Sequence, residues 1–380
     1  MEIDKKMIAS SVELPGCKLK ITDKDGNQIV SWTSGDMMTI ELSKELDSLG
    51  YSNVKASMNE KGNLIVNGLL HDMEYTLSET KPADGYVTAS DITFKLVEDA
   101  TEGTSKTKVL IKGATYGTSV TEELTKDKEE FVEAKENKVI MYDDTTKLEF
   151  SKVSITDDKE LPGCKLKVTD KETGVVMDEW ISTETTHMVE GKYVAGKTYI
   201  LSETKPADGY VTAADVEFTV LDDGKVQGVK MVDDTTKVEF SKFASDTKKQ
   251  LKNAKYQVFD SKGKKVYEFT TGKKSEMIEG ILKVGETYTF KEVDAPEHYK
   301  LAKDVKITIK DTGKVQKLSA VDARIPVVPD TPQTGWVGNT IGNIIGIILL
   351  LFAIVCVACV IAKDESKYNF KPEEKENEEE

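Results

Sequence analysis

Three glutamates recur at the same place in a repeated pattern of this sequence, on a strand face that should be buried. The twelve residues SETKPADGYVTA occur at Ser78–Ala89 and again at Ser202–Ala213, and a degenerate third copy spans Lys291–Tyr299. Strand side chains alternate between faces, so a Glu two positions after an apolar residue shares its face. Tyr, a large apolar residue and Glu alternate in this way at Tyr75/Leu77/Glu79, Tyr199/Leu201/Glu203 and Tyr288/Phe290/Glu292. A lone carboxylate is unfavourable in a core, so each Glu needs a partner.

A lysine and an aspartate recur with the same regularity. Each lysine lies nine positions before a repeat leucine (Leu14, Leu161 or Leu251), and these lysines are Lys5, Lys152 and Lys242. Each aspartate follows alternating apolar residues near the end of a repeat, and these aspartates are Asp143, Asp233 and Asp322. Alternation predicts that both residue types face the core. The neighbouring Lys6, Lys147 and Lys237 are expected to be ordinary solvated lysines, and Asp144 and Asp234 are the second choice for the aspartate.

One Lys, one Glu and one Asp are thus expected in each of three cores. The simpler interpretation is a buried salt-bridged triad, but such triads rarely repay their desolvation. The sharper interpretation is bond formation, because burial lowers the pKa of a lysine and raises the pKa of a carboxyl group. A neutral lysine amine is a nucleophile, a protonated Asp is an electrophile, and the Glu can transfer protons as general acid and base. Loss of water would leave an isopeptide bond, promoted by proximity and the exclusion of water.

Internal repeats divide the chain into three units, roughly 1–146, 147–236 and 237–325. LPGCKLKITDK at Leu14–Lys24 returns as LPGCKLKVTDK at Leu161–Lys171. The pattern DDTTK-EFSK occurs at both boundaries between units, where it ends one unit and begins the next. Short runs with turn signals between them predict all-β units, each a small antiparallel sandwich. The first unit is longer, and its extra Ile40–Leu46 is expected to form one or two helical turns. A second insertion lies within 100–137.

These residues resemble the Cna protein B-type domains, also called SpaA-type or prealbumin-like domains, of Gram-positive surface proteins. The resemblance rests on FSK at 150–152 and 240–242, LPGC, YTLSE, SETKPADGY and the closing Asp, and it covers nearly all of 1–325. It implies three tandem Ig-like Greek-key β-sandwiches, each with a self-formed bond and a catalytic Glu. The implied sets are Lys5–Asp143 with Glu79, Lys152–Asp233 with Glu203, and Lys242–Asp322 with Glu292. The sequence departs from the family pattern at Pro82 and Pro206, which come one position early, and at His298, which replaces a Gly.

The C-terminal part of the sequence resembles a sortase sorting signal. The Pro-rich stretch 326–335 ends in Thr331, Pro332, Gln333, Thr334 and Gly335. An uncharged segment, 336–362, follows, and its densest part, 344–362, would measure about 28 Å as a helix, close to the hydrocarbon thickness of about 30 Å. The charged tail 363–380 carries lysines that place it on the cytoplasmic side. The resemblance implies that a sortase cuts after Thr334 and joins it to a peptidoglycan or pilin amine.

Composition excludes several other classes of protein. The net charge of −15 argues against nucleic acid as a partner. The cysteines form no disulfide framework: Cys17 and Cys164 are expected at small buried positions, where the third unit has Ala254, although a reactive thiol is the alternative. Cys356 and Cys359 are interpreted as ordinary apolar residues of the membrane segment. His71, His187 and His298 form no ligand cluster, so no metal and no cofactor are expected.

Together these features predict a cell-wall-anchored surface stalk or pilin subunit that is not an enzyme, apart from a single reaction on itself. Its expected partners are a sortase, a peptidoglycan or pilin amine and, through the C-terminal helix, the membrane. The alternative is an adhesin that binds a host surface ligand through its enlarged first unit. A surface enzyme is disfavoured, because the sequence shows no catalytic set of residues outside the three cores. A tail-anchored cytoplasmic protein is supported only by the charged start, Met1–Lys6, which resembles no signal peptide.

Overall fold

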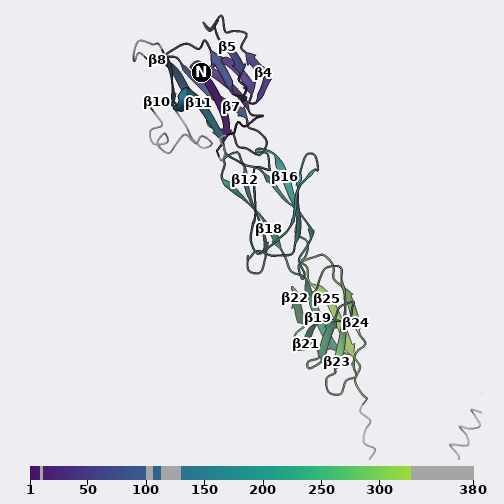
Figure 1. Cartoon of the computed structure of the whole chain (residues 1–380). Coiled ribbons are helices and arrows are strands. Elements are labelled where there is room, and N and C mark those ends of the chain that lie inside the picture. The colour runs from purple at the N-terminus through teal and green to yellow at the C-terminus, as the bar shows by residue number, and fades with distance from the viewer. Residues whose placement is uncertain (9–11, 100–105, 113–129, 327–380) are drawn as a thin grey trace, which may run out of the picture. The chain divides into compact units, whose positions relative to one another are not determined.

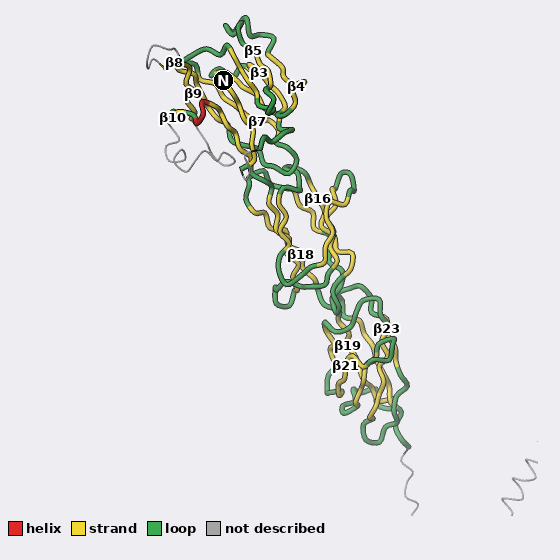
Figure 2. Tube along the Cα trace, viewed as in Figure 1, coloured by secondary structure: helices red, strands yellow, loops and turns green. Residues whose placement is uncertain are grey.

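The computed structural model describes residues 1–8, 12–99, 106–112 and 130–326, and these residues form β-sandwiches (Figure 1). Strands and loops make up nearly all of them, with a short 3-10 segment, η2, at Lys135–Asn137 (Figure 2). The all-β class is therefore confirmed. The predicted C-terminal membrane helix falls in 327–380, outside the described residues. No helix within the described ranges has the length and apolarity to cross a membrane.

The second sandwich has the simplest architecture, with two sheets in the orders β15-β12-β18 and β14-β13-β16-β17. Its strands are β12 (Lys147–Ser154), β13 (Lys165–Asp170), β14 (Val176–Ile181), β15 (His187–Glu190), β16 (Thr198–Lys205), β17 (Val216–Thr219) and β18 (Val226–Asp233). The third sandwich repeats the same two orders, β22-β19-β25 and β21-β20-β23-β24. Its strands are β19 (Lys237–Ala244), β20 (Lys255–Phe259), β21 (Lys265–Thr270), β22 (Glu276–Glu279), β23 (Thr287–Asp294), β24 (Val305–Thr308) and β25 (Gln316–Asp322).

The first sandwich is an enlarged version of this arrangement, with sheets in the orders β11-β1-β6-β5 and β10-β9-β8-β7-β2-β3-β4. Its strands are β1 (Glu2–Met7), β2 (Lys18–Asp23), β3 (Gln28–Thr33), β4 (Asp36–Leu42), β5 (Lys55–Met58), β6 (Leu64–Asn67), β7 (Glu74–Lys81), β8 (Ile92–Asp99), β9 (Lys106–Lys112), β10 (Val132–Glu133) and β11 (Lys138–Asp143). The prediction of helical turns at Ile40–Leu46 is wrong. This segment continues β4 to Leu42 and then enters a loop of non-helical turns.

The first and last strands of every sandwich pair in parallel, which the expectation of a purely antiparallel sandwich missed. β1 pairs with β11, β12 with β18 and β19 with β25, all in parallel, whereas the other ladders between the described strands run antiparallel. In the second sandwich Lys152 lies opposite Met231 and Asp233 opposite Ser154. The pairing therefore brings the lysine of the first strand close to the aspartate that ends the last strand.

Alternating residues along these strands form the cores between the sheets. In the second sandwich Leu148, Phe150, Tyr199 and Leu201 are buried, as the alternation predicted. The recurring tyrosine also fastens a loop, because its phenol accepts a hydrogen bond from the backbone N–H five residues earlier. These bonds measure 2.9 Å at Tyr75, 3.1 Å at Tyr199 and 3.0 Å at Tyr288. The apolar part of each repeat is thus explained by packing between its two sheets.

The identical copies of SETKPADGYVTA also contact the sandwich that follows each of them. Thr146 N donates to Gly85 O over 2.9 Å, and Thr236 N donates to Gly209 O over 2.8 Å. A Cβ at Gly85 would lie 2.2 Å from Gly191 O, and a Cβ at Gly209 would lie 2.2 Å from Gly280 O. Only glycine fits this approach between backbones.

The degenerate third copy carries His298 at the equivalent position. The residue keeps a left-handed φ of 67°, close to the 89° and 88° of the two glycines. Its carbonyl still accepts a backbone hydrogen bond, from Ile325 N over 2.8 Å. The turn itself therefore tolerates a side chain. The glycines of the first two copies are required by the neighbouring sandwich.

We expect Gly209→Ala to loosen the contact between the second and third sandwiches. The added methyl group meets the Gly280 carbonyl and also enters a φ of 88°. The control is Gly196→Ala, where φ is 77° and nothing lies within 4 Å of the new Cβ, so that only backbone strain of about 1 to 2 kcal/mol applies. Hydrogen exchange of the Thr236 amide should accelerate by at least about tenfold more in Gly209→Ala than in the control, a difference of about 1.4 kcal/mol. Equal exchange in the two variants would contradict the contact.

Candidate functional site

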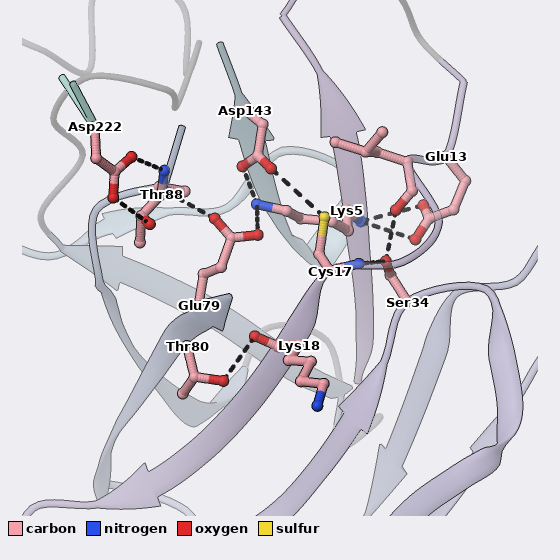
Figure 3. A network of polar contacts seen from close by, with 12 residues as sticks. Lys5, Glu13, Cys17, Lys18, Ser34, Glu79, Thr80, Thr88, Asp143 and Asp222 are labelled. Atoms are coloured by element: carbon pink, nitrogen blue, oxygen red, sulfur yellow. Dashed lines mark hydrogen bonds and ion pairs between the residues drawn. The ribbon is translucent and has the colours of Figure 1, made fainter. Parts of the chain in front are cut away.

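A lysine ammonium lies between two carboxylates in the core of the first sandwich (Figure 3). Lys5 Nζ contacts Asp143 Oδ1 directly and lies 3.0 Å from Glu79 Oε1. The side chains are 1% exposed for Lys5 and 0% for both acids. The ion pair with Glu79 lies outside hydrogen-bond geometry, so Oε1 receives no hydrogen bond from the described residues.

The other two sandwiches repeat this arrangement. Lys152 contacts Asp233 Oδ1 and lies 3.1 Å from Glu203 Oε1. Lys242 contacts Asp322 Oδ1 and donates a hydrogen bond of 3.0 Å to Glu292 Oε2. The side chains of both sets are at most 2% exposed. The structure thus brings together all nine residues that the sequence singled out, in three separate cores.

The spacing that identified the lysines has a structural cause. In each sandwich the backbone N–H of the repeat leucine donates to the carbonyl of the lysine nine positions earlier. These bonds measure 2.6 Å for Leu14, 2.7 Å for Leu161 and 2.7 Å for Leu251. The chain therefore folds back immediately after the lysine and fixes its strand against the segment that opens the second sheet.

Each glutamate is held from the other sheet by the loop that follows it. Its Oε2 accepts a hydrogen bond from the backbone N–H ten residues later, from Ala89 over 2.7 Å, from Ala213 over 2.8 Å and from Ala302 over 2.5 Å. The repeated motif SETKPADGYVTA therefore carries the core carboxylate at its second position and ends with the amide that orients it. In the first two sandwiches this leaves Oε1 directed at the lysine.

Burial changes the acidity of the aspartates. It raises the pKa of Asp143 to about 7, although the charge of Lys5 opposes the rise. It likewise raises the pKa of Asp233 to about 6, against the hydrogen bond and charge of Lys152. In the third sandwich burial raises the pKa of Glu292. A carboxyl group that is readily protonated near neutral pH suits both an electrophile and a proton carrier.

Two cysteines complete the first two sites. Cys17 Sγ lies 3.5 Å from Asp143 Oδ2, and Cys164 Sγ lies 3.6 Å from Asp233 Oδ2. Both residues are fully buried, as expected for this small position. Burial also raises the pKa of Cys164 to about 12, so this thiol has little thiolate character. The alternative of a reactive thiol is disfavoured by this environment.

The sequence reasoning missed two carboxylates that support the lysine strands. The Lys5 backbone N–H donates to Glu13 over 3.1 Å, and the Lys152 N–H donates to Glu160 over 3.1 Å. Burial raises the pKa of Glu13 to about 8. Both residues stand directly before the repeat LPG, and this shared position was the available signal. They orient the strand backbone and do not contact the lysine ammonium.

The neighbouring lysines and aspartates have a role of their own. Lys147 and Lys237 were expected to be ordinary solvated lysines, but their side chains are only 21% and 22% exposed. Lys147 Nζ lies 2.5 Å from Asp144 and donates to Gly224 O over 3.1 Å. Lys237 likewise pairs with Asp234 and donates to Gly313 O over 3.4 Å. The second-choice aspartates therefore lie outside the cores.

Cysteine and carboxylate atoms come close enough in the first two sites to consider a metal ion. Cys17, Glu79 and Asp143 each offer a ligand atom within 4.8 Å of the others, and Cys164, Glu203 and Asp233 do the same. However, the lysine ammonium already lies between the two carboxylates and offsets part of their charge. The protonated thiol is also a poor metal ligand. This donor set suits chemistry between its own members better than a cation.

The remaining predicted site residues, Thr331, Pro332, Gln333, Thr334 and Gly335, lie outside the described residues.

Comparison with known proteins identifies the repeated fold. The family of SpaA prealbumin-like fold domains matches residues 1–110, 146–235 and 236–324. No curated protein matches the chain. Among solved structures, the chain is similar to the Bacillus anthracis TIE protein at 18% identity with a TM-score of 0.38, over 85% of this chain and 50% of that one. This chain therefore spans half the length of that protein.

Two further similar structures come from Lactobacillus rhamnosus GG. One is the shaft pilin SpaA, at 16% identity with a TM-score of 0.26, over 48% of this chain and 99% of that one. The other is a C-terminal fragment of the pilus adhesin SpaC, at 15% identity with a TM-score of 0.30, over 48% of this chain and 99% of that one. Because the family matches most of the sequence in three consecutive copies, this chain belongs to the family of SpaA-type prealbumin-like fold domains.

Proposed function

We propose that this protein is a structural subunit of the Gram-positive cell surface, a stalk or pilin, whose sandwiches are each locked by a Lys–Asp isopeptide bond. The observation that carries the proposal is the threefold recurrence of a buried lysine in contact with an aspartate and flanked by a glutamate. A buried ion pair adds little stability, so three in one chain call for a reason beyond folding. Bond formation supplies that reason.

The reaction is a condensation within each core. One proton passes from the Lys152 ammonium to Asp233, which leaves a neutral amine and a neutral acid, and the raised pKa of Asp233 favours this step. The amine lone pair attacks Asp233 Cγ, and Glu203 accepts a proton from the attacking nitrogen. Glu203 then gives that proton to the hydroxyl oxygen, the C–O bond breaks, and water leaves. The products are an amide, one water molecule and an ionised Glu203.

Each group has a position suited to its step. The lysine nitrogen contacts the carboxyl group that it attacks, which supplies the proximity of an intramolecular reaction. Glu203 Oε1 lies 3.1 Å from that nitrogen and receives no hydrogen bond from the described residues, so it is available to take a proton. Burial keeps bulk water away from the forming amide. This is a single turnover on the protein itself, and we assign the chain no outside substrate.

The surface role is supported by the family and by the sequence beyond the sandwiches. Tandem domains of this family suit a load-bearing stalk. In each sandwich the first and last strands are far apart in the sequence, and the proposed covalent link joins them directly. The segment 331–335, the uncharged 336–362 and the charged 363–380 follow one another in the order of a sortase signal. In the proposal, a sortase joins Thr334 to a peptidoglycan or pilin amine, and the C-terminal helix holds the chain in the membrane until then.

Intact mass spectrometry of the full chain tests the bonds directly. We expect a mass below that of the sequence by three waters, one for each sandwich. A variant with Lys5, Lys152 and Lys242 all replaced by Ala should show the mass of its own sequence, because it has no amine to react. If the native chain also shows the full sequence mass, the three sites are ion pairs only and the proposal fails.

A second candidate function, a ligand-binding adhesin, is favoured by one observation in the first sandwich. Met37 and Met38 on the edge strand β4 are 63% and 87% exposed, and they belong to the enlarged part of this sandwich. Exposed apolar side chains on an insertion are common at binding surfaces. An assay of attachment to host cells separates the two functions. If the chain is an adhesin, Met38→Glu should lower its attachment, and if the chain is only a stalk, the variant should attach like the native chain.

A further inference from the structure

The two oxygens of the reacting aspartate have different neighbours in the first and second sandwiches. Asp233 Oδ1 contacts the Lys152 amine, whereas Oδ2 lies 3.6 Å from Cys164 Sγ. Asp143 is divided in the same way, with Oδ1 on Lys5 and Oδ2 3.5 Å from Cys17 Sγ (Figure 3). The cysteine therefore touches the group that reacts, from the side opposite the lysine.

The third sandwich lacks this contact. Ala254 stands at the cysteine position, and Asp322 Oδ2 has no hydrogen-bond partner among the described residues. The third site has a different polar neighbour, Tyr256, whose hydroxyl lies 2.7 Å from Lys242 Nζ on the amine side. The same protein thus contains two sites in which a cysteine thiol contacts the aspartate carboxyl group and one site in which it does not.

We propose that Cys17 and Cys164 are catalytic hydrogen-bond donors that stabilise the oxyanion formed on Asp Oδ2 during isopeptide formation. This inference rests on the proposed function, because it assigns a role within that reaction. A donor that is placed in advance on the oxygen where charge develops lowers the barrier most effectively in a water-free site. The cysteine needs no nucleophilic role for this purpose.

The role fits the balance of the reaction. When the Lys152 nitrogen bonds to Asp233 Cγ, the carbonyl electrons move to Oδ2, which becomes the oxyanion beside the thiol. The proton lost by the nitrogen travels through Glu203 to the Oδ1 hydroxyl. The C–Oδ1 bond breaks, water leaves from the lysine side, and the Oδ2 electrons return to form the amide carbonyl. The thiol keeps its proton throughout and donates the same hydrogen bond at every stage.

The environment of the cysteine preserves its proton. Cys164 is fully buried, and its backbone N–H is fixed by a hydrogen bond of 2.9 Å to Ser182 Oγ. Burial raises the pKa of the Cys164 thiol to about 12, so the S–H group persists at neutral pH. Cys17 is held in the same way, with a bond of 3.0 Å from its N–H to Ser34 Oγ. Both thiols are therefore fixed donors.

The test compares the rate of bond formation in Cys164→Ala and Cys164→Ser. The full chain is produced by cell-free translation, synthesis is stopped, and samples are quenched in acidic denaturant at intervals. Peptide mapping then gives the crosslinked fraction of each sandwich separately. Alanine is the natural residue at the equivalent position of the third sandwich, so the fold accommodates it. Serine has nearly the volume of alanine but restores a donor, and the first and third sandwiches serve as controls in the same molecule.

We expect Cys164→Ala to lengthen the half-time of the second bond by about tenfold, less than the loss of a strong oxyanion donor, because a thiol donates weakly. Cys164→Ser should stay within about threefold of the native rate, and the other two bonds should keep their rates. A native rate in Cys164→Ala would overturn the inference, and so would equal slowing in both variants, which indicates packing. If no sandwich crosslinks in the native chain, the proposed function itself fails instead.

Discussion

Glu203→Gln should abolish the Lys152–Asp233 crosslink while the second sandwich remains folded. The amide side chain keeps the shape of glutamate, and its oxygen can still accept the hydrogen bond from Ala213 N. It cannot take a proton from the lysine nitrogen. Because general acid–base catalysis contributes roughly 10²- to 10⁴-fold, the second bond should be nearly absent in this variant at the time when the native chain has just completed its own.

The matched control is Glu217→Gln on the adjacent strand β17. Glu217 is 54% exposed and pairs with Lys171, so the change alters the same functional group outside the core. Peptide mapping of the full chain should find all three crosslinks in this control and only the first and third in Glu203→Gln. Hydrogen exchange should find the second sandwich protected in both. A second crosslink at native level in Glu203→Gln would remove the glutamate from the mechanism.

The sequence was informative wherever strand periodicity decides the outcome. The alternation Tyr199/Leu201/Glu203 placed the glutamate in the core, and the fixed distance from Lys152 to Leu161 located the lysine. The structure explains both, through the sheet interface and through the Leu161 N to Lys152 O hydrogen bond of 2.7 Å. Two-residue periodicity specifies a face, and three repeats supplied three independent readings of it.

Periodicity does not specify the partner of a strand, and the errors follow from this. Nothing local in β12 and β18 reveals that they pair in parallel, since Lys152 and Asp233 are 81 positions apart. Alternation separates Lys147 from the core lysine Lys152, but it does not reveal that Asp144 and Gly224 contact Lys147, so Lys147 was misjudged as solvated. Ile40–Leu46 was misjudged because its apolar residues suit a short helix as well as the edge strand that it joins.

The thiol contact was beyond sequence reasoning for a different reason. The interchange of Cys164 with Ala254 indicated a small buried position, and both residues are indeed fully buried. Volume alone does not reveal a neighbouring carboxyl oxygen. That neighbour, Asp233 Oδ2, comes from the end of the last strand, 69 positions away. Only the closed sandwich brings it to the thiol.

Under load, loss of the Lys152–Asp233 bond should add one unfolding step to the full chain. Force enters the second sandwich at the start of β12 and leaves after β18, and these strands are parallel neighbours. With the bond in place, tension passes from Lys152 directly to Asp233, and the intervening residues 153–232 carry none. Without it, the strands shear apart at a rate set by the unfolding barrier. The closed loop also stabilises the fold by about 4 to 5 kcal/mol if it behaves like a disulfide loop.

Single-molecule pulling of the full chain from its two ends measures this step. Lys152→Ala removes the amine, and Glu203→Gln removes the proton carrier while the Lys152–Asp233 pair stays intact. Both variants should release about 270 to 290 Å of hidden chain, at 3.3 to 3.6 Å per residue. Lys171→Ala, on the exposed Lys171–Glu217 pair, is the control and should extend like the native chain. If the native chain shows the same step as often as the two variants, the sandwich does not resist tension through a covalent bond, and the stalk mechanism is wrong whatever mass is measured.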